Sequence, residues 1–216
     1  MEISISVLCW NDLDDIKILI PSILKEVERS KHRYTINVID NGSADGTNEY
    51  LKEFKELSVV FFDQNYGIGI AKNALIDKAL ASDSKYMFMF DGDVSVIPDS
   101  FDSMIDWMEC NESVACLGQN INNYTKNIND KKIMVPCKIT DDIIDLNIKS
   151  GCNTIRSWTH YSIYLLDVFK TVKFDTNGPF GGPGYGFDDD DLGMQISENG
   201  YDIACFNHIY IYHNIN

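Results

Sequence analysis

The sequence predicts an α/β fold in a single domain, with a mostly parallel sheet flanked by helices. Short apolar runs alternate with helix-periodic segments through residues 1–118, as in strand–helix–strand units with right-handed crossovers. A length of 216 residues suits one domain with a sizeable core. Each early apolar run stops at polar or glycine residues, so these residues should gather at one edge of the sheet, where ligands of open α/β sheets bind.

The first half of the chain contains four expected strands, each followed by a helical pattern. The first strand is broken at Trp10 and a helix begins at Leu13, in which Pro21 should cause a kink or a restart. Turn residues dominate the segment from Asp40 to Thr47, ahead of the second helix. The expected strands are residues 3–9, 34–40, 58–62 and 85–91, and the expected helices begin near residues 13, 47 and 70.

The second half of the chain is less regular. A helix is expected at 99–109, with Pro98 at its start, and a strand at 114–118. Residues 119–150 are rich in Asn, Lys and Asp and form either a surface excursion or a flap that shapes a pocket, with β-like pieces at 133–139. The remaining expected elements are a helix under the sheet at 161–169, a glycine-rich loop at 177–187, a helix from the acidic run through Glu198, and strands at 201–206 and 209–212.

Two carboxylates follow the fourth strand directly. The apolar run that starts after Lys85 ends in Asp91-Gly92-Asp93, at the carboxyl edge of the predicted sheet. Gly92 lets the backbone approach a ligand closely, and the two aspartates can face one hard cation. Asp-x-Asp also occurs by chance as a solvated turn, but the preceding strand is too apolar to be exposed. The pattern therefore favours a site for a metal-chelated phosphate.

The composition narrows the possible ligands and the compartment. A net charge of −15, with 33 acids and 18 bases, supplies no basic stripe for a nucleic-acid partner, so an anionic ligand would need a divalent cation as a bridge. The six cysteines form no Cys-x-x-Cys pair and are interpreted as reduced, mostly buried thiols. With no leader and no transmembrane segment in the pattern, the expectation is a soluble, cytoplasmic protein.

Several motifs, in order, resemble the inverting, family-2-like glycosyltransferases of GT-A fold. The resemblance covers most of the chain outside residues 120–150, and the order and spacing of the motifs make it specific. It implies a sheet like that of nucleotide-diphospho-sugar transferases, with a nucleotide-sugar-binding half at 1–118 and an acceptor-binding half at 119–216. The motifs are Val7 to Asn11, Val38 to Thr47, Asn65-Tyr66-Gly67 with Ala71-Lys72-Asn73, Asp91-Gly92-Asp93, Gly184 to Leu192, and His213.

The resemblance also implies roles on the donor side. Trp10 would stack on the nucleobase, Asp40 would accept its imino N–H, and Lys72 would lie near the diphosphate. Asp91 would contact the ribose or, through water, the metal. Asp93 would ligate Mn²⁺ or Mg²⁺, and His213 either completes that site or is an ordinary surface histidine. The expected nucleotide-sugar contacts are Cys9, Trp10, Asn11, Asp40, Asn65, Lys72, Asp91, Gly92 and Asp93, and the expected metal ligands are Asp91, Asp93 and His213.

A second acidic cluster should serve the acceptor. Gly184 to Leu192 resembles the family's glycine-rich motif that ends in Glu-Asp. Aligned in this way, Asp189 is the catalytic base and Asp188 binds the acceptor beside it, while Tyr185 and Gly186 belong to the acceptor site. Asp188 stands where the family usually has Glu, so its reach is shorter by one methylene. The simpler interpretation is a run of acids that caps a helix, although four adjacent acids repel one another without a ligand.

These observations predict a metal-dependent glycosyltransferase. It would move a sugar with inversion from a nucleotide-diphosphate donor, most commonly UDP-linked in the family, to a hydroxyl of a glycan or glycoconjugate. One alternative is a sugar-nucleotide pyrophosphorylase, but that class needs a glycine-rich, basic loop after the first strand, and Cys9-Trp10-Asn11-Asp12 contains neither glycine nor a base. The other is a non-catalytic glycan-binding relative, which fold analogy alone does not exclude.

Overall fold

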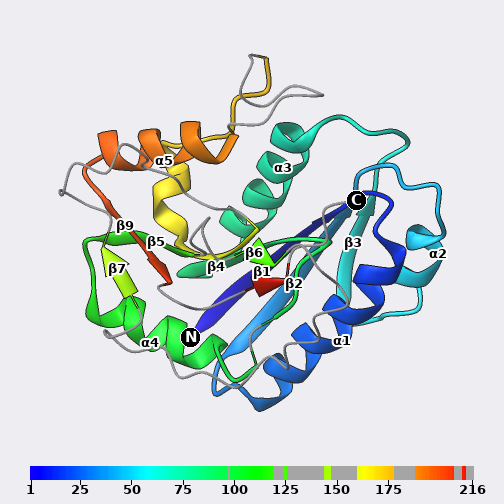
Figure 1. Ribbon diagram of the computed structural model, residues 1–216, viewed down its shortest axis with the longest axis horizontal. Helices are drawn as coiled ribbons and strands as arrows, with labels where there is room; N and C mark the ends of the chain where they lie inside the picture. The colour runs from blue at the N-terminus through cyan, green and yellow to red at the C-terminus, as the bar shows by residue number, and fades with distance from the viewer. Residues whose placement is uncertain are drawn as a thin grey trace.

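A computed structural model describes residues 1–96, 98–118, 124–125, 144–146, 160–177, 188–206 and 211–212. Its centre is an eight-stranded sheet in the order β3-β2-β1-β4-β8-β5-β9-β7, and β10 pairs separately with β6 (Figure 1). Neighbouring strands are parallel except where β8 pairs with β4 and β5 and where β7 pairs with β9. The predicted α/β architecture, a mostly parallel sheet flanked by helices, is confirmed.

The elements follow the predicted alternation over the first 118 residues. Pro21 lies inside one continuous helix, α1, and α2 is a short helix that ends before Phe54. The strands are β1 Glu2–Cys9, β2 Arg33–Asp40, β3 Leu57–Phe61, β4 Tyr86–Asp91, β5 Val114–Gly118, β6 Tyr124–Thr125, β7 Ile144–Leu146, β8 Tyr161–Leu165, β9 Asp202–Phe206 and β10 Ile211–Tyr212. The helices are α1 Leu13–Arg29, α2 Thr47–Leu51, α3 Ile68–Leu80, α4 Phe101–Cys110, the 3₁₀ helix η3 Leu166–Lys170, and α5 Asp188–Glu198.

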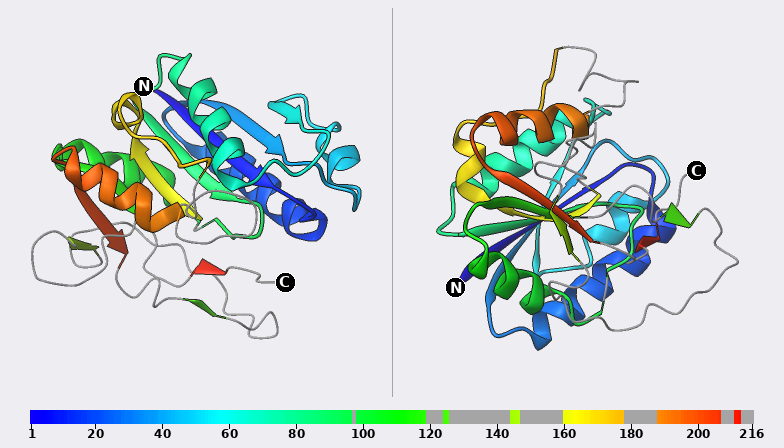
Figure 2. Two further views of the ribbon diagram at one scale, coloured as in Figure 1. Left: turned by 90° about the horizontal axis from the view of Figure 1, so that it is seen from above. Right: turned by 60° about the vertical axis from the view of Figure 1, so that its left-hand side comes forward.

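Helices cover both faces of the sheet. The core of one face combines β1 and β4 side chains with α1 and α4, and that of the other joins α3, η3 and α5 to β4, β5 and β8. Figure 2 shows α1 and α4 on one side of the sheet and α3 and α5 on the other. β1 is buried along nearly its whole length, as expected for a central parallel strand, and this includes its two serines, Ser4 and Ser6. No helix among the described residues combines the length and apolarity needed to cross a bilayer.

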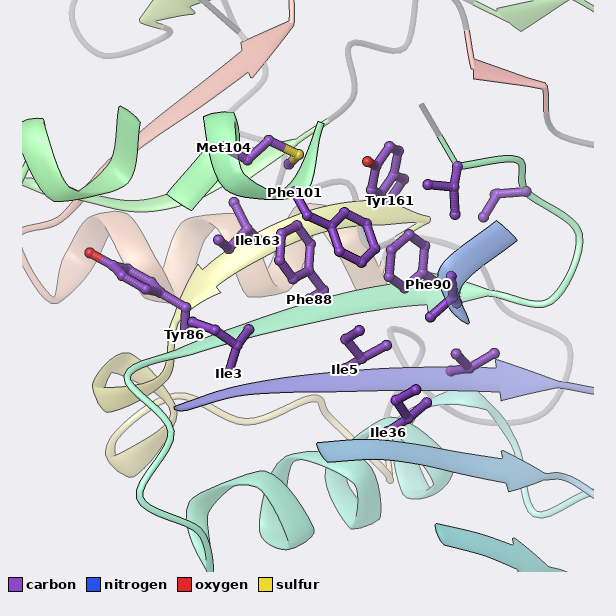
Figure 3. Packing of buried hydrophobic residues seen from close by; sticks show 14 of the residues in the cluster. Ile3, Ile5, Ile36, Tyr86, Phe88, Phe90, Phe101, Met104, Tyr161 and Ile163 are labelled. Atoms are coloured by element: carbon purple, nitrogen blue, oxygen red, sulfur yellow. The ribbon is translucent and has the colours of Figure 1, made fainter. Parts of the chain in front are cut away.

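Aromatic rings anchor the α4 side of the core (Figure 3). The ring centroids of Phe88 and Phe101 are 4.4 Å apart, and those of Phe90 and Tyr161 are 4.8 Å apart. The expected helix at 99–109 begins at Phe101, because Asp99 has a positive φ of 59° and so cannot belong to a right-handed helix. The Glu26 carboxylate accepts hydrogen bonds from the backbone N–H groups of Asp99 and Ser100 at 2.9 and 3.1 Å. A side chain of α1 therefore fixes the start of α4.

The helix expected at 161–169 is wrong. Residues Tyr161–Leu165 form strand β8, antiparallel between β4 and β5, and only Leu166–Lys170 turns helically. Four of the five residues in this short run are apolar or aromatic, and such a run fits either period; the edges of β4 and β5 between which it lies select the strand. As a consequence, the start of β8 lies beside the end of β4, with Phe90 opposite Tyr161.

Candidate active site

The ends of β1, β2 and β4 meet at one edge because their registers align them. Cys9 is paired with Asp40, and Leu8 with Asp91. A cleft of about 340 Å³ opens at this edge. Six of the predicted donor-site residues line it, together with five that were not predicted. The eleven residues are Leu8, Cys9, Trp10, Asp12, Asn41, Asn65, Ile68, Asp91, Gly92, Asp93 and His160.

The loop after β1 is fastened to the loop after β2. Asn11, with a positive φ of 56°, donates its backbone N–H to Ser43 Oγ at 2.8 Å, and its side-chain oxygen accepts from the Ala44 N–H at 2.8 Å. Asp40 is 1% exposed and accepts from the Ser43 N–H at 3.0 Å. Neither Asn11 nor Asp40 lines the cleft, whereas Trp10 is 50% exposed and does. Contacts to a nucleobase stay predictions for Trp10 and Asp40, and Asn11 holds the two loops together.

Asn65 reaches the cleft through a loop that Asn41 holds in place. Asn41 is 2% exposed; its amide nitrogen donates to Asn65 Oδ1 at 3.0 Å and its oxygen accepts from the Tyr66 N–H at 3.0 Å. Asn65 Oδ1 also accepts from the Gly67 N–H at 2.8 Å. This network sets the entry into α3 and keeps the exposed Asn65 at the rim of the cleft.

Gly92 is required by a close approach between the ends of β4 and β1. A Cβ atom at position 92 would lie 2.5 Å from Asp12 Oδ2 and 2.9 Å from the Cβ atom of Cys9. Any side chain there would push the Asp91-Gly92-Asp93 turn away from the β1 loop. Gly92 was predicted to allow a ligand to approach closely. In the structure it allows the turn after β4 to pack closely against Cys9 and Asp12.

Asp12 is a cleft carboxylate that the sequence analysis did not single out. Burial, followed by the nearby charges of Asp93, Asp15 and Asp91, raises its pKa from 3.8 to about 6, against the hydrogen bond that its Oδ2 accepts from the Trp10 N–H at 2.9 Å. Its position in the sequence could have indicated this role, because an acid two residues after Trp10 is still close to the end of the first strand. Asp12 therefore adds negative charge to the same edge as Asp93.

We expect Asp12→Asn to stabilise the protein at neutral pH. The pKa of Asp12 is about 6 in the folded state, above its ordinary value of 3.8. Ionisation of Asp12 therefore lowers the stability of the folded protein as the pH rises from about 4 to 6, and the loss persists above that interval. At pH 7.5 in chelator, the free energy of unfolding of the variant, measured by urea denaturation, should exceed that of the parent by about 1 kcal/mol. The difference should shrink at pH 5. Asp14→Asn is the control, because the Asp14 side chain is 97% exposed. A variant less stable than the parent at pH 7.5 would contradict this assignment.

Lys72 lies beneath the cleft. It is 1% exposed, and its Nζ atom is 3.2 Å from Asp91 Oδ1 and 3.5 Å from Asp188 Oδ2. Burial alone would lower the pKa of the ammonium, but the charges of Asp91, Asp188 and Asp189 outweigh it and raise the pKa. Lys72 does not line the cleft. Lys72 is thus a buried link between Asp91 and Asp188, and its contact with the diphosphate stays a prediction.

His160 is the second cation of this cluster and was also missed. Its Nδ1 atom is 2.5 Å from Asp91 Oδ2, and its Nε2 atom is 3.6 Å from Asp189 Oδ2. Burial would lower the pKa of the imidazole, but Asp91 and then Asp189 outweigh it and raise the pKa to about 9. Conversely, Lys72 and His160 hold the pKa of the Asp91 carboxyl well below its usual range despite burial. His160 reaches Asp91 because the antiparallel strand β8 begins directly after it. The helix expected at 161–169 gave no reason to place His160 at this edge of the sheet.

The acidic run forms the first turn of α5, as predicted. The Asp188 and Asp189 side chains are each 12% exposed, and they face Lys72 and His160 respectively. Asp191 turns elsewhere, since its Oδ2 accepts a hydrogen bond from Gln195 at 2.7 Å. Capping alone leaves unexplained why two of these acids meet buried cations that also hold Asp91. Tyr185, Gly186 and His213 lie outside the described residues.

The donor set for a cation centres on Asp93. Asp91 and Asp93 both line the cleft, and both oxygens of Asp91 face the protein cations Lys72 and His160. No three His, Cys, Asp or Glu side chains within the described ranges are placed to share a metal ion. One or two carboxylates, completed by substrate phosphates, suit Mg²⁺. The residues therefore fit a metal that arrives with a diphosphate, held at Asp93.

Comparisons with solved structures agree with this architecture. S. aureus TarS 1–349 matches with a TM-score of 0.71 and 16% identity over 99% of this chain and 60% of that chain. Its complex with UDP-GlcNAc matches with a TM-score of 0.72 and 15% identity, over 100% of this chain and 59% of the other. The mannosyltransferase PcManGT from Pyrobaculum calidifontis, with GDP-Man and Mn²⁺, matches with a TM-score of 0.66 and 14% identity, over 99% and 57%. These likenesses show a GT-A fold.

Sequence comparisons identify the family. A curated relative from Bacillus subtilis (strain 168), "Putative teichuronic acid biosynthesis glycosyltransferase TuaG", is 24% identical over 151 residues, which are 68% of this chain and 58% of that protein. The chain thus spans less than two thirds of the relatives it matches. The family model described as Glycosyl transferase family 2 matches residues 4–172, well over half of the chain. This chain therefore belongs to glycosyl transferase family 2.

Proposed function

We propose that this chain transfers a sugar, with inversion, from a nucleotide-diphosphate donor to a hydroxyl of a glycan or glycoconjugate. Residues 1–118 would bind the donor and residues 119–216 the acceptor. The observation that carries the proposal is the convergence of Asp91, at the end of β4, and Asp189, at the start of α5, on the two ring nitrogens of His160. Donor-side and acceptor-side carboxylates thereby meet at one edge of the sheet, as a group transfer requires.

On the donor side, the half-exposed indole of Trp10 offers a face on which a nucleobase can stack. Asn65 and Asp93 are the polar groups at the rim that would meet the ribose and diphosphate. Mn²⁺ or Mg²⁺ held at Asp93 would neutralise charge on the departing diphosphate. UDP-GlcNAc and GDP-Man are bound by two of the structural neighbours, the second together with Mn²⁺, which makes them the first donors to test.

On the acceptor side, Asp189 would take the proton of the attacking hydroxyl. The acceptor oxygen forms a bond to the anomeric carbon while the bond from that carbon to the diphosphate oxygen breaks, so a single displacement inverts the configuration. Asp188 would hold acceptor hydroxyls, and Tyr185 and Gly186 are expected in the same site. The net charge of −15 supports a cation-assisted rather than an arginine-rich donor site.

The alternatives predict different results. A pyrophosphorylase would need a basic loop after β1, yet the residues there that line the cleft are Cys9, Trp10 and the acidic Asp12. A glycan-binding relative would need neither a cation nor a base. The deciding experiment is a screen of UDP- and GDP-sugars for nucleotide release in Mn²⁺, with acceptor glycans added and omitted. No release from any donor in any combination would overturn the proposed function.

Metal removal is the sharpest test of the donor half. We expect the affinity for UDP, measured by calorimetry, to fall at least about tenfold in chelator, and Asp93→Ala to have the same effect in Mn²⁺ because the metal then loses its carboxylate. Asp83→Ala is the matched control, since Asp83 is exposed between α3 and β4. Unchanged UDP affinity in chelator would remove the metal from the proposal.

A further inference from the structure

His160 is fixed by the backbone at the junction of the two halves of the site. Its carbonyl accepts a hydrogen bond from the Asp91 N–H at 3.1 Å, and the next residue, Tyr161, is opposite Phe90 in the β4–β8 pairing. Tyr161 is itself held by its ring contact with Phe90 and by a hydroxyl contact of 2.5 Å with Ser100 Oγ. The position of the imidazole is therefore set by a buried sheet rather than by a loop.

The ring is held on both sides. Nδ1 contacts Asp91 Oδ2 at 2.5 Å, Nε2 faces Asp189 Oδ2 at 3.6 Å, and the His160 side chain is 16% exposed. A rotation that carried one nitrogen towards a ligand would break a carboxylate contact. The arrangement has a parallel in Lys72, which spans from Asp91 to Asp188. Asp188 and Asp189, the first two residues of α5, are thus each linked through a cation to Asp91 at the end of β4.

The Asp189 carboxylate needs a contact that fixes its orientation, because its surroundings also favour other orientations of the side chain. A carboxylate in the first turn of a helix is attracted back towards the free N–H groups of that turn. Asp188, Asp190 and Asp191 add like charges on the same turn. A proton acceptor in a transfer reaction must instead point steadily at the attacking hydroxyl, and small misplacements cost large factors in rate.

We propose that His160 is a positioning residue for sugar transfer, which bridges Asp91 to Asp189 and so holds the Asp189 carboxylate in line with the donor cleft. This inference rests on the proposed function, in which Asp189 takes the acceptor proton. It gives Asp91 a structural task towards the acceptor half of the site in addition to any contact with the donor. His160 itself need not touch either substrate.

The kinetic test compares His160→Gln, Asp189→Asn and the double variant. His160→Gln should lower kcat at least about tenfold and leave the calorimetric affinity for UDP with Mn²⁺ within about twofold. If His160 acts through Asp189, the double variant should be no slower than Asp189→Asn alone. His32→Gln is the control, a buried histidine near the start of β2, and should behave as the parent.

A spectroscopic test does not depend on activity. With ¹⁵N-labelled histidine, the ring signals of His160 can be assigned by their loss in His160→Gln. Asp189→Asn should then shift the Nε2 signal of His160 more than its Nδ1 signal, because only the Nε2 contact has been altered. This measurement also serves if His160→Gln fails to fold, since the assignment can be made through Asp91→Asn, which should shift Nδ1.

The outcomes separate this inference from the proposed function. Multiplicative losses in the double variant, or an Nε2 signal that ignores Asp189→Asn, would overturn the bridge while the parent still transfers sugar. A fall in UDP affinity with kcat unchanged would make His160 a donor contact and overturn it as well. If the parent transfers no sugar but its Nε2 signal still responds to Asp189→Asn, the contact between His160 and Asp189 would stand and the proposed transferase function would be overturned.

Discussion

Asp189→Asn is expected to lower turnover by about 100-fold or more while leaving the affinity for UDP with Mn²⁺ within about twofold. The carboxamide has nearly the same shape as the carboxylate but cannot take the proton of the acceptor hydroxyl. Donor binding should survive because Asp189 lies at the start of α5 and does not line the cleft at the ends of β1 and β4. Turnover is measured as nucleotide release from the donor that the screen identifies, and affinity by calorimetry.

Asp191→Asn is the matched control for this experiment. It lies in the same helical turn, but its carboxylate accepts a hydrogen bond from Gln195 within α5. We expect it to keep most of the parental turnover, whereas Asp188→Asn should mainly raise the acceptor concentration required. Loss of turnover in Asp188→Asn or Asp191→Asn, with Asp189→Asn active, would move the base to another residue. Parental activity in all three would reduce the acidic run to a helix cap.

Lys72→Met should destabilise the protein by about 3–5 kcal/mol, the usual cost of removing one partner of a buried ion pair. Lys72 is 1% exposed between Asp91 and Asp188, and its Nζ atom lies 5.5 Å from the centre of the Phe174 ring. Methionine fills a similar volume, so the loss comes from carboxylates that keep their burial without their cation. Urea unfolding followed by tryptophan fluorescence measures the change.

Lys173→Met provides the comparison for the buried pair. Lys173 forms an ion pair with Asp77, but both side chains are largely exposed, at 42% and 68%. Removing it should cost no more than about 1 kcal/mol, because exposed pairs gain little in water. Equal, small losses in both lysine variants would mean that the Asp91 and Asp188 carboxylates do not depend on Lys72.

The sequence predicted the parallel half of the fold because its signals are local. The runs that became β1, β2, β3 and β4 alternate with helical periodicity, and the polar residues that follow them were predicted to gather at the edge of the sheet where the cleft lies. Strand β8 was predicted as a helix, because Tyr161–Leu165 is a short run whose apolar and aromatic residues fit either the helical or the strand period. What decides its state is the space between β4 and β5, and no pattern within five residues contains that information.

The candidate site was predicted in the same uneven way. Asp91, Gly92 and Asp93 stand out in the sequence because a buried strand ends at them, and they do line the cleft. His160 could be found only from the antiparallel partner of β4, and the sequence did not indicate that Lys72 is buried against Asp91. Residue types indicate which groups can carry chemistry, whereas burial and pairing decide which of them meet a substrate and which hold the others.

The antiparallel insertion of β8 separates variation from chemistry in this chain. Five consecutive β8 residues are paired with β4, from Tyr86 opposite Leu165 to Phe90 opposite Tyr161. Since this ladder, together with the hydrogen bond from the Asp91 N–H to the His160 carbonyl, sets the place of His160, we expect the connection that leads from β5 to β8 to tolerate changes in length and composition without moving the imidazole. Under the proposed function that connection belongs to the acceptor-binding half, so changes in it would alter the acceptor site while leaving the contact between His160 and Asp189 in place.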